Sequence, residues 1–354
     1  MICDDSGVIR AAIARMLDGE PGLSVVARVT NGRQALEELA RQSRPGLPGI
    51  DVVVLDIEMP EMDGMTALPL LLKAAPDLRV IMASTLTTQG ADIALRALRL
   101  GAADYVPKPS AATLFGDQNF RRELVAKIKG LARLRHRAVQ RATVAEPVAR
   151  VASTRPAPAR RPRLLAIGSS TGGPQALFTL VQGLGNRLPV PVVLTQHMPP
   201  TFTAMLADHL ARLNALPCAE AKDGERLAPG RIYVAPGDRH LLIRGRAGDA
   251  LQAQLSTDPP ENFCRPAVDP MLRSAAEACE GRVLVVMLTG MGHDGLAGTR
   301  SIVAAGGAAL AQDEATSVVW GMPGAIARAG LCHAVLPLPR IAPRVLELIG
   351  SGPQ

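Results

Sequence analysis

Short apolar runs alternate with helix-like stretches along the first third of the chain. Between residues 25 and 109, runs typical of buried strands precede stretches whose apolar residues recur at helical spacing. In chain order the segments are Leu23–Val29, Ala35–Arg41, Val52–Leu55, Met65–Ala75, Val80–Ala83, Ala91–Leu100 and Tyr105–Val106. Such alternation predicts a parallel sheet with crossover helices. We therefore expect a parallel α/β domain in residues 1–130.

The same alternation returns after a break. A helix predicted at Asn119–Arg135 gives way to an Arg/Ala/Pro-rich stretch, so residues 131–162 are predicted to be a linker. Beyond it, five runs are typical of buried strands: Leu164–Ile167, Val190–Thr195, Arg231–Val234, Val283–Leu288 and Ala308–Ala311. Most are followed by Gly-rich turns and helical patterns. We predict a second, Rossmann-like α/β domain with a mostly parallel sheet in residues 163–354.

The composition agrees with two domains and limits the classes of partner that we expect. The 354 residues are 47% hydrophobic but only 2% aromatic, so the cores are aliphatic and platforms for stacking bases are scarce. No apolar run approaches the roughly 20 residues of a membrane span. The net charge of +7 comes with an arginine cluster in the linker, where a solvated segment explains it. We expect a cytoplasmic monomer with reduced cysteines, no nucleic-acid partner and no membrane insertion.

Carboxylates gather at the predicted strand ends of the first domain. Asp4 and Asp5 follow the short apolar start, and Asp56 follows a predicted strand. Ligand sites in parallel α/β sheets form at these carboxyl ends. Crowded carboxylates repel one another, and Mg²⁺ with its preference for oxygen ligands relieves that cost. Ser84 and Lys108 end the next two strands, where they suit the oxygens of a phosphoryl group on Asp56.

Few residues precede this acidic pair. Only Met1, Ile2 and Cys3 come before Asp4, whereas strands usually have five or six residues. Either the start is mis-assigned or the central strand of this domain is weakened.

The ordered set resembles the receiver domain of two-component response regulators. It consists of Asp4-Asp5, Asp56 with Met59-Pro60 and Asp63-Gly64, then Ser84, then Lys108-Pro109. The resemblance implies a (βα)5 fold in which a histidine kinase phosphorylates Asp56. It also implies that the backbone carbonyl of Glu58 completes the Mg²⁺ shell. Ser84 and Tyr105, with Lys108, would form the switch that senses phosphorylation of Asp56.

A serine, a histidine and an aspartate follow predicted strands of the second domain. The pattern Gly168-x-Ser170-x-Gly172 fits a nucleophile elbow before a helix, although such turns also cradle phosphate or cap a helix. His197 closes the next apolar run and could act as base, and Asp294 could orient it. His293 competes as base but adjoins Asp294, and neighbouring side chains rarely face each other.

Several segments of the second domain together are similar to the chemotaxis protein-glutamate methylesterase family. They are Gly168–Gly173, Thr195–Pro200, Asp223–Glu225, Ala235–Asp238, Leu288–Gly292 and Ala311–Thr316. The resemblance implies that Ser170 attacks the ester, His197 transfers its proton, Asp294 fixes the imidazole, and the Thr171 and Met291 amides stabilise the oxyanion. Two positions depart from the family pattern: Ala267 where serine is usual, and Trp320 where phenylalanine is common.

The resemblance also implies a function and its control. The substrates would be γ-methyl esters of glutamates on methyl-accepting chemoreceptors, hydrolysed with release of methanol, and receptor glutamines would be deamidated by the same chemistry. No cofactor is expected for the ester hydrolysis. The unphosphorylated receiver would cover the catalytic cleft until phosphate on Asp56 loosens the contact.

Two other classes of function are open from the residues alone. The second domain could bind a nucleotide or phosphate through the Ser170 loop, which predicts no acylation of Ser170. A DNA-binding regulator would suit the receiver and the charge, but the second half shows no compact helix-turn-helix pattern.

Overall fold

The computed structural model describes residues 1–44, 46–84, 87–108, 118–143, 160–186, 188–213, 216–245 and 250–350. The chain divides into two compact units, Met1–Pro147 and Val148–Gln354. This division falls inside the predicted linker, whose residues 144–159 lie outside the described residues, as does Pro109. The predicted domain boundaries, after residues 130 and 162, stay predictions.

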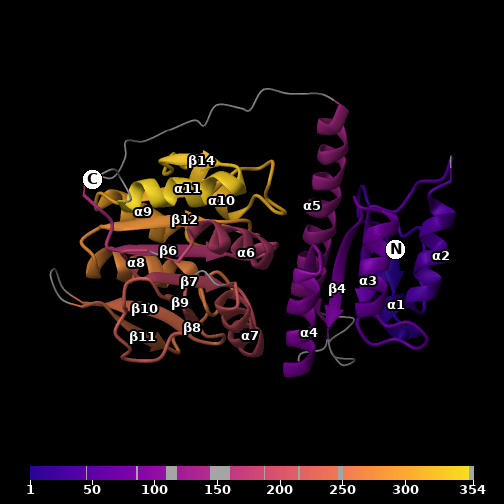
Figure 1. Ribbon diagram of the computed structural model, residues 1–354, viewed down its shortest axis with the longest axis horizontal. Coiled ribbons are helices and arrows are strands. Elements are labelled where there is room, and N and C mark those ends of the chain that lie inside the picture. The colour runs from indigo at the N-terminus through magenta and orange to yellow at the C-terminus, as the bar shows by residue number, and fades with distance from the viewer. Residues whose placement is uncertain are drawn as a thin grey trace. The chain divides into compact units, whose positions relative to one another are not determined.

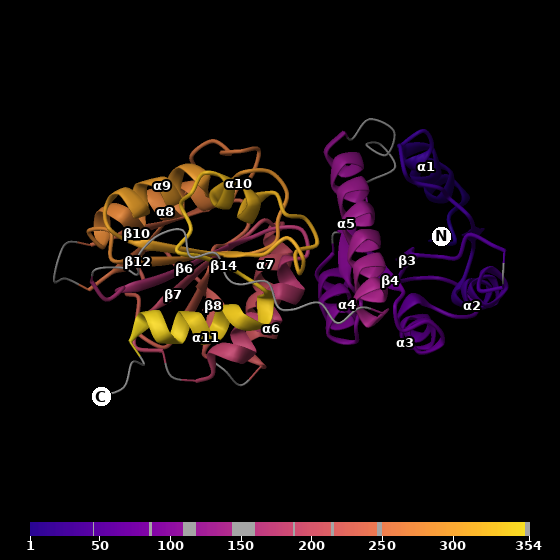
Figure 2. The same ribbon diagram turned by 90° about the horizontal axis from the view of Figure 1, so that it is seen from above.

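The first unit is a five-stranded parallel sheet between two layers of helices. The strand order is β2-β1-β3-β4-β5, and every pairing is parallel. Helices α1 and α5 cover one face of the sheet, and α2, α3 and α4 cover the other (Figure 2). The elements are β1 (Ile2–Cys3), α1 (Gly7–Leu17), β2 (Arg28–Val29), α2 (Gly32–Gln42), β3 (Val52–Asp56), α3 (Gly64–Ala74), β4 (Arg79–Ser84), α4 (Thr88–Arg99), β5 (Asp104–Pro107) and α5 (Gln118–Thr143). The predicted parallel α/β fold is confirmed.

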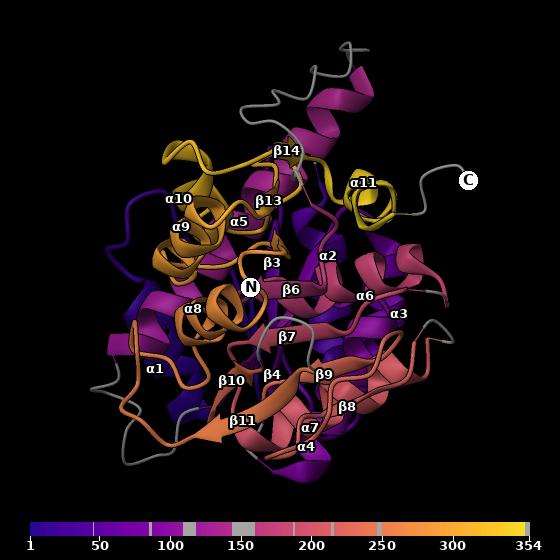
Figure 3. The same cartoon turned by 90° about the vertical axis from the view of Figure 1, so that its left-hand side faces the viewer.

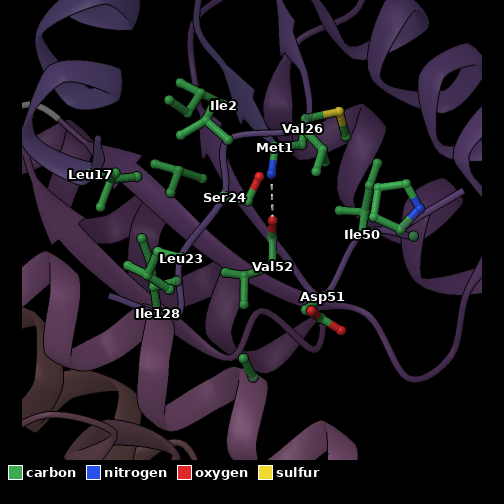
Figure 4. Close-up of a pocket in the computed structure, with 16 residues that line it drawn as sticks. Met1, Ile2, Leu17, Leu23, Ser24, Val26, Ile50, Asp51, Val52 and Ile128 are labelled. Atoms are coloured by element: carbon green, nitrogen blue, oxygen red, sulfur yellow. Dashed lines mark hydrogen bonds between the residues drawn. The ribbon is translucent and has the colours of Figure 1, made fainter. Parts of the chain in front are cut away.

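Strand β1 is short but central. It pairs with β2 on one side and β3 on the other, and the Met1 ammonium donates a hydrogen bond to the Val52 carbonyl at 2.8 Å. Burial lowers the pKa of this amino group to about 6. A pocket lies beside Met1, with Leu17, Leu23 and Ile128 among its lining residues (Figure 4). Two residues of strand are thus enough here to bridge β2 and β3.

Gly64, at the start of α3, lies against the end of strand β3. A Cβ atom there would lie 2.0 Å from the Asp56 carbonyl oxygen, which is backbone and cannot move aside. We expect Gly64→Ala to lower the free energy of unfolding by about 1–3 kcal/mol, the usual range for overpacking. Denaturant unfolding of the full chain measures this. Gly7→Ala is the matched control, because its Cβ would meet only the Arg10 guanidinium at 3.7 Å; equal stability of the two variants would contradict the prediction.

The second unit is built on a larger parallel sheet (Figure 1). Seven strands lie in the order β14-β13-β12-β6-β7-β9-β8, all parallel, and β10 and β11 form a separate antiparallel pair. The strands are β6 (Leu164–Ser169), β7 (Val192–Gln196), β8 (Cys218–Glu220), β9 (Ile232–Val234), β10 (His240–Arg244), β11 (Gln252–Ser256), β12 (Val283–Met287), β13 (Ala308–Gln312) and β14 (Ala334–Leu336). All five predicted strands are confirmed.

Helices cover both faces of this sheet. Helices α8, α9 and α10 lie on one face, and α6 and α11 lie on the other, with α7 beside α6 (Figures 2 and 3). Their bounds are α6 (Gly173–Leu184), α7 (Pro200–Ala211), α8 (Val268–Ala278), α9 (Leu296–Ala304), α10 (Met322–Arg328) and α11 (Leu338–Ile349). Strands β6, β7, β12 and β13 are buried along their whole length, as expected for parallel strands with helices on both faces.

Among the described residues, no helix is both long enough and apolar enough to cross a membrane.

Candidate catalytic and phosphorylation sites

The acidic residues of the first unit converge at the carboxyl ends of β1 and β3. One carboxylate oxygen each from Asp4, Asp5 and Asp56 lies within 4.8 Å of the others. Asp4 and Asp56 are buried, and Asp5 is exposed. The Lys108 ammonium reaches Asp4 Oδ2 at 2.8 Å and Asp56 Oδ2 at 2.6 Å. The structure therefore brings four of the predicted residues together.

The electrostatics of this cluster suit a divalent cation. Burial raises the pKa of Asp56 to about 6; the hydrogen bond and charge of Lys108 oppose the shift, and the charge of Asp4 adds to it. Three carboxylates face one ammonium, so the negative charge is in excess, and hard carboxylate oxygens are the ligands that Mg²⁺ prefers. The donor set thus fits the ion.

Three predicted residues of the first unit remain, and the structure places Glu58 and Ser84 in the pocket of the acidic cluster but Tyr105 outside it. Glu58, Ser84 and Lys108 line one pocket with Asp5 and Asp56. The Ser84 hydroxyl donates to the Gly90 carbonyl at 2.7 Å.

Tyr105, by contrast, is buried in the interior, where the Lys127 ammonium lies 5.0 Å from its ring centroid. Burial raises the pKa of the Tyr105 phenol well above its ordinary value. The switch roles of Ser84 and Tyr105 stay predictions.

In the second unit, Ser170 and His197 follow neighbouring strands at the same level. Ser169 is paired with Gln196 in the β6–β7 ladder, and the His197 amide donates to the Ser169 carbonyl at 3.2 Å. Adjacent strands lie about 4.8 Å apart, so the residues that follow this pair are close neighbours. Strand order reverses between β6 and β12, and ligands of open α/β sheets bind at such a switch point.

The turn after β6 needs its two glycines. Gly172 has φ 74°, and a Cβ there would lie 2.5 Å from Val318. A Cβ on Gly173 would lie 2.0 Å from the Gln196 side-chain oxygen. The left-handed residue of the turn is therefore Gly172 and not Ser170. The Ser170 hydroxyl is half-buried and has no hydrogen-bond partner within the described ranges.

His197 is bonded through both ring nitrogens. Its Nε2–H donates to Asp294 Oδ2 at 2.7 Å, and its Nδ1 lies 3.4 Å from the Cys264 thiol. Burial disfavours the charged imidazolium, but the hydrogen bonds and charges of Asp294 and Cys264 outweigh it and raise the pKa of His197 from 6.5 to about 10. Because Nε2 is occupied by the carboxylate, Nδ1 is the atom that can accept a proton.

Asp294 also caps helix α8. Its carboxylate accepts hydrogen bonds from the amides of Val268 at 2.6 Å and Asp269 at 3.0 Å, and from Asn262 Nδ2 at 2.9 Å. Burial tends to raise its pKa, but these bonds and His197 hold the pKa of Asp294 below its ordinary value. Ala267, at the N-cap position, has no side chain that can cap the helix, and Asp294 accepts the bonds from the first two amides of α8 instead.

The two amides predicted for the oxyanion have no partners to displace. Within the part of the chain that the structure describes, neither the Thr171 nor the Met291 amide donates a hydrogen bond. Unpaired amides beside a serine at a strand end suit the stabilisation of a developing negative charge. The oxyanion assignment stays a prediction.

The structure separates the competing histidines. His293 is exposed and lies in the loop between β12 and α9, whereas His197 is the imidazole bonded to Asp294. His240 is buried, and its Nδ1 accepts from the Ala267 amide at 3.2 Å. The geometry supports His197, and not His293, as the base.

Two residues beside the site were missed from the sequence. Cys264 contacts His197, and Asn262 bridges Asp269 and Asp294 with its amide nitrogen. No motif singled out in the sequence contains either residue.

Fold and sites together define a response regulator with an enzyme-type output domain. Residues 165–345 match the CheB methylesterase family, and residues 1–116 match the response regulator receiver domain family. The chain belongs to the CheB methylesterase family, which confirms the resemblance.

Individual relatives align with this chain over nearly their whole length. A protein-glutamate methylesterase/protein-glutamine glutaminase of Rhodospirillum centenum is 52% identical, with 98% of this chain and 93% of the relative covered. A protein of the same name from Azospirillum brasilense is 51% identical, with 98% and 91% covered. The crystal structure of the Thermotoga maritima CheB methylesterase catalytic domain matches with a TM-score of 0.51 at 40% identity, covering 53% of this chain and all of that domain.

Proposed function

We propose that this protein hydrolyses γ-methyl esters of glutamate side chains in chemoreceptors, releasing methanol, and deamidates receptor glutamines. The observation that carries the proposal is the 2.7 Å bond between His197 and Asp294 at the strand ends beside Ser170. The names of relatives that align over nearly their full length point to the same chemistry and to both substrates.

The reaction uses three side chains in sequence. The Ser170 hydroxyl attacks the ester carbonyl while Nδ1 of His197 takes its proton. Asp294 holds Nε2–H and stabilises the imidazolium. The Thr171 and Met291 amides bind the oxyanion, His197 returns the proton to departing methanol, and water then cleaves the acyl-serine ester by the same steps. With a glutamine side chain, ammonia leaves in place of methanol.

Control belongs to the first unit. A histidine kinase of the chemotaxis system is the phosphodonor for Asp56. Asp4, Asp5 and Asp56, with the Glu58 carbonyl, would hold Mg²⁺, which supplies charge neutralisation for phosphoryl transfer when bound. Lys108 lies within bonding distance of Asp56, where its ammonium can pair with phosphoryl oxygens.

Phosphorylation of Asp56 should activate the esterase. Addition of acetyl phosphate and Mg²⁺ to the full chain is expected to raise methanol release from methylated receptor by roughly 5- to 150-fold, the usual range of coupling between sites. Asp56→Asn should remove this stimulation and keep the unstimulated rate. The measurement is methanol release with and without the donor. Stimulation that survives in the asparagine variant would refute Asp56 as the acceptor.

A further inference from the structure

A two-residue hairpin turn lies between β11 and α8. Glu261 and Cys264 form both backbone hydrogen bonds of the closing pair, at 3.1 Å and 2.9 Å. Between them Asn262 has φ 53° and Phe263 has φ 64°. Positive φ at both central residues is the pattern of a type I′ turn, which favours Asn-Gly. Phenylalanine therefore stands where glycine is preferred.

This conformation is held by the surroundings of the turn and not by the phenyl ring. Glu261 accepts two hydrogen bonds from Arg273, both at 2.6 Å. Asn262 donates to Asp269 at 3.0 Å and to Asp294. A bulky residue in the left-handed region is strained, and such strain persists only where neighbouring contacts impose it.

The Phe263 side chain gains nothing from packing. Its relative exposure is 89%, the highest among the exposed large hydrophobic residues of the described chain. Phe120, Phe178 and Phe202 are buried in the cores. An aromatic side chain that is both strained and exposed is costly for folding, which points to a role in binding.

We propose that Phe263 is a specificity-determining residue that contacts an apolar side chain of the substrate protein beside the esterified glutamate. This inference rests on the proposed esterase function. The residues on either side of Phe263 touch the site directly, Asn262 at Asp294 and Cys264 at the His197 imidazole. The backbone at Phe263 is therefore fixed relative to the reacting groups, and we expect a protein segment that brings an ester to Ser170 to pass near its side chain.

The proposed contact of Phe263 increases the affinity for a protein substrate and does not take part in the hydrolysis itself. The methyl ester of one glutamate offers little surface, whereas a receptor protein also offers the residues around that glutamate. An exposed aromatic side chain at the edge of a site supplies a large contact area and is typical of residues that dominate protein recognition. We infer that the enzyme distinguishes an ester on a protein from a free ester through this ring.

The test compares two substrates with the full chain. One is methylated receptor, and the other is the γ-methyl ester of N-acetylglutamate amide. In Phe263→Ala, the ratio of kcat/KM for receptor to kcat/KM for the small ester should fall about 5- to 30-fold, the range for loss of a strong contact residue. The fall should lie in KM for receptor. Phe263→Leu should restore part of the ratio, and Val8→Ala, which shortens another exposed apolar side chain, should leave it unchanged.

A glycine variant separates binding from folding. Phe263→Gly relieves the left-handed strain, so its Tm should rise by about 2–4 °C while its substrate ratio falls as in the alanine variant. An unchanged ratio in both variants would overturn the inference. So would a gain in small-ester hydrolysis without phosphodonor, which would show that the ring contacts the receiver domain. Absence of methanol release by the unmodified protein would instead remove the proposed function.

Discussion

Ser170→Ala is expected to reduce methanol release from methylated receptor by a factor on the order of 10⁴ or more, as for loss of a nucleophile in other serine hydrolases. Among the described residues the Ser170 hydroxyl has no hydrogen-bond partner to lose, so its removal should not affect folding. The loss should therefore appear in kcat, with Tm unchanged.

The measurement combines methanol release with detection of the acyl-enzyme. Ser301→Ala is the matched control, because its hydroxyl lies on helix α9 and donates to the Ala297 carbonyl at 3.3 Å. Activity that persists in Ser170→Ala would reject the nucleophile and would favour the alternative of a phosphate-binding second domain. A mass increase on Ser170 in the unmodified protein, absent in the variant, is the positive counterpart.

Asp294→Asn is expected to lower kcat by a factor on the order of 10³–10⁴, the scale known for the corresponding change in a serine protease triad. The carboxylate accepts from His197, Asn262 and the first amides of α8 at once. An amide group has only one acceptor oxygen, so at least one buried donor loses its partner. The variant should therefore also unfold at a lower temperature.

The pH profile separates catalysis from stability in this variant. The hydrogen bonds and charges of Asp294 and Cys264 raise the pKa of His197 to about 10, and the base acts only when it is deprotonated, so activity should rise as the pH increases toward that value. Without the carboxylate the pKa of His197 falls, and the rising limb of residual kcat/KM should move to lower pH. Asp238→Asn is the control, since Asp238 pairs with Arg265 and not with His197. A limb that stays in place would contradict the assignment of His197 as base.

The central strands could be predicted because their apolar runs are continuous. Segments such as Val52–Leu55 and Val283–Leu288 are apolar on both faces, which is typical of strands buried in a parallel sheet. Strand β11 was missed, although Gln252–Ser256 alternates polar and apolar residues, because the prediction relied on continuous apolar runs. Helix α5 extends beyond the predicted Asn119–Arg135. The prediction ended too early because the polar continuation of the helix lacks the apolar spacing on which the prediction depended.

The site was predictable to the extent that it lies at strand ends. Ser170, His197 and Asp56 each follow an apolar run, and parallel strands bring their carboxyl ends to one edge. Asn262 and Cys264 come from a loop whose path depends on left-handed backbone and on hydrogen bonds to residues about 30 to 70 positions away in the chain. No local pattern encodes such contacts, so only the folded structure could reveal them.

One carboxylate both closes the first turn of α8 and holds the imidazole. Fraying of that single turn would remove two of the hydrogen bonds that keep the carboxylate ionised and oriented, even while the sheet remains intact. Loss of activity on heating can therefore begin with local opening at the start of α8, before the whole domain melts. Substitutions that strengthen the start of this helix would therefore prolong the working life of the enzyme without touching its reacting groups.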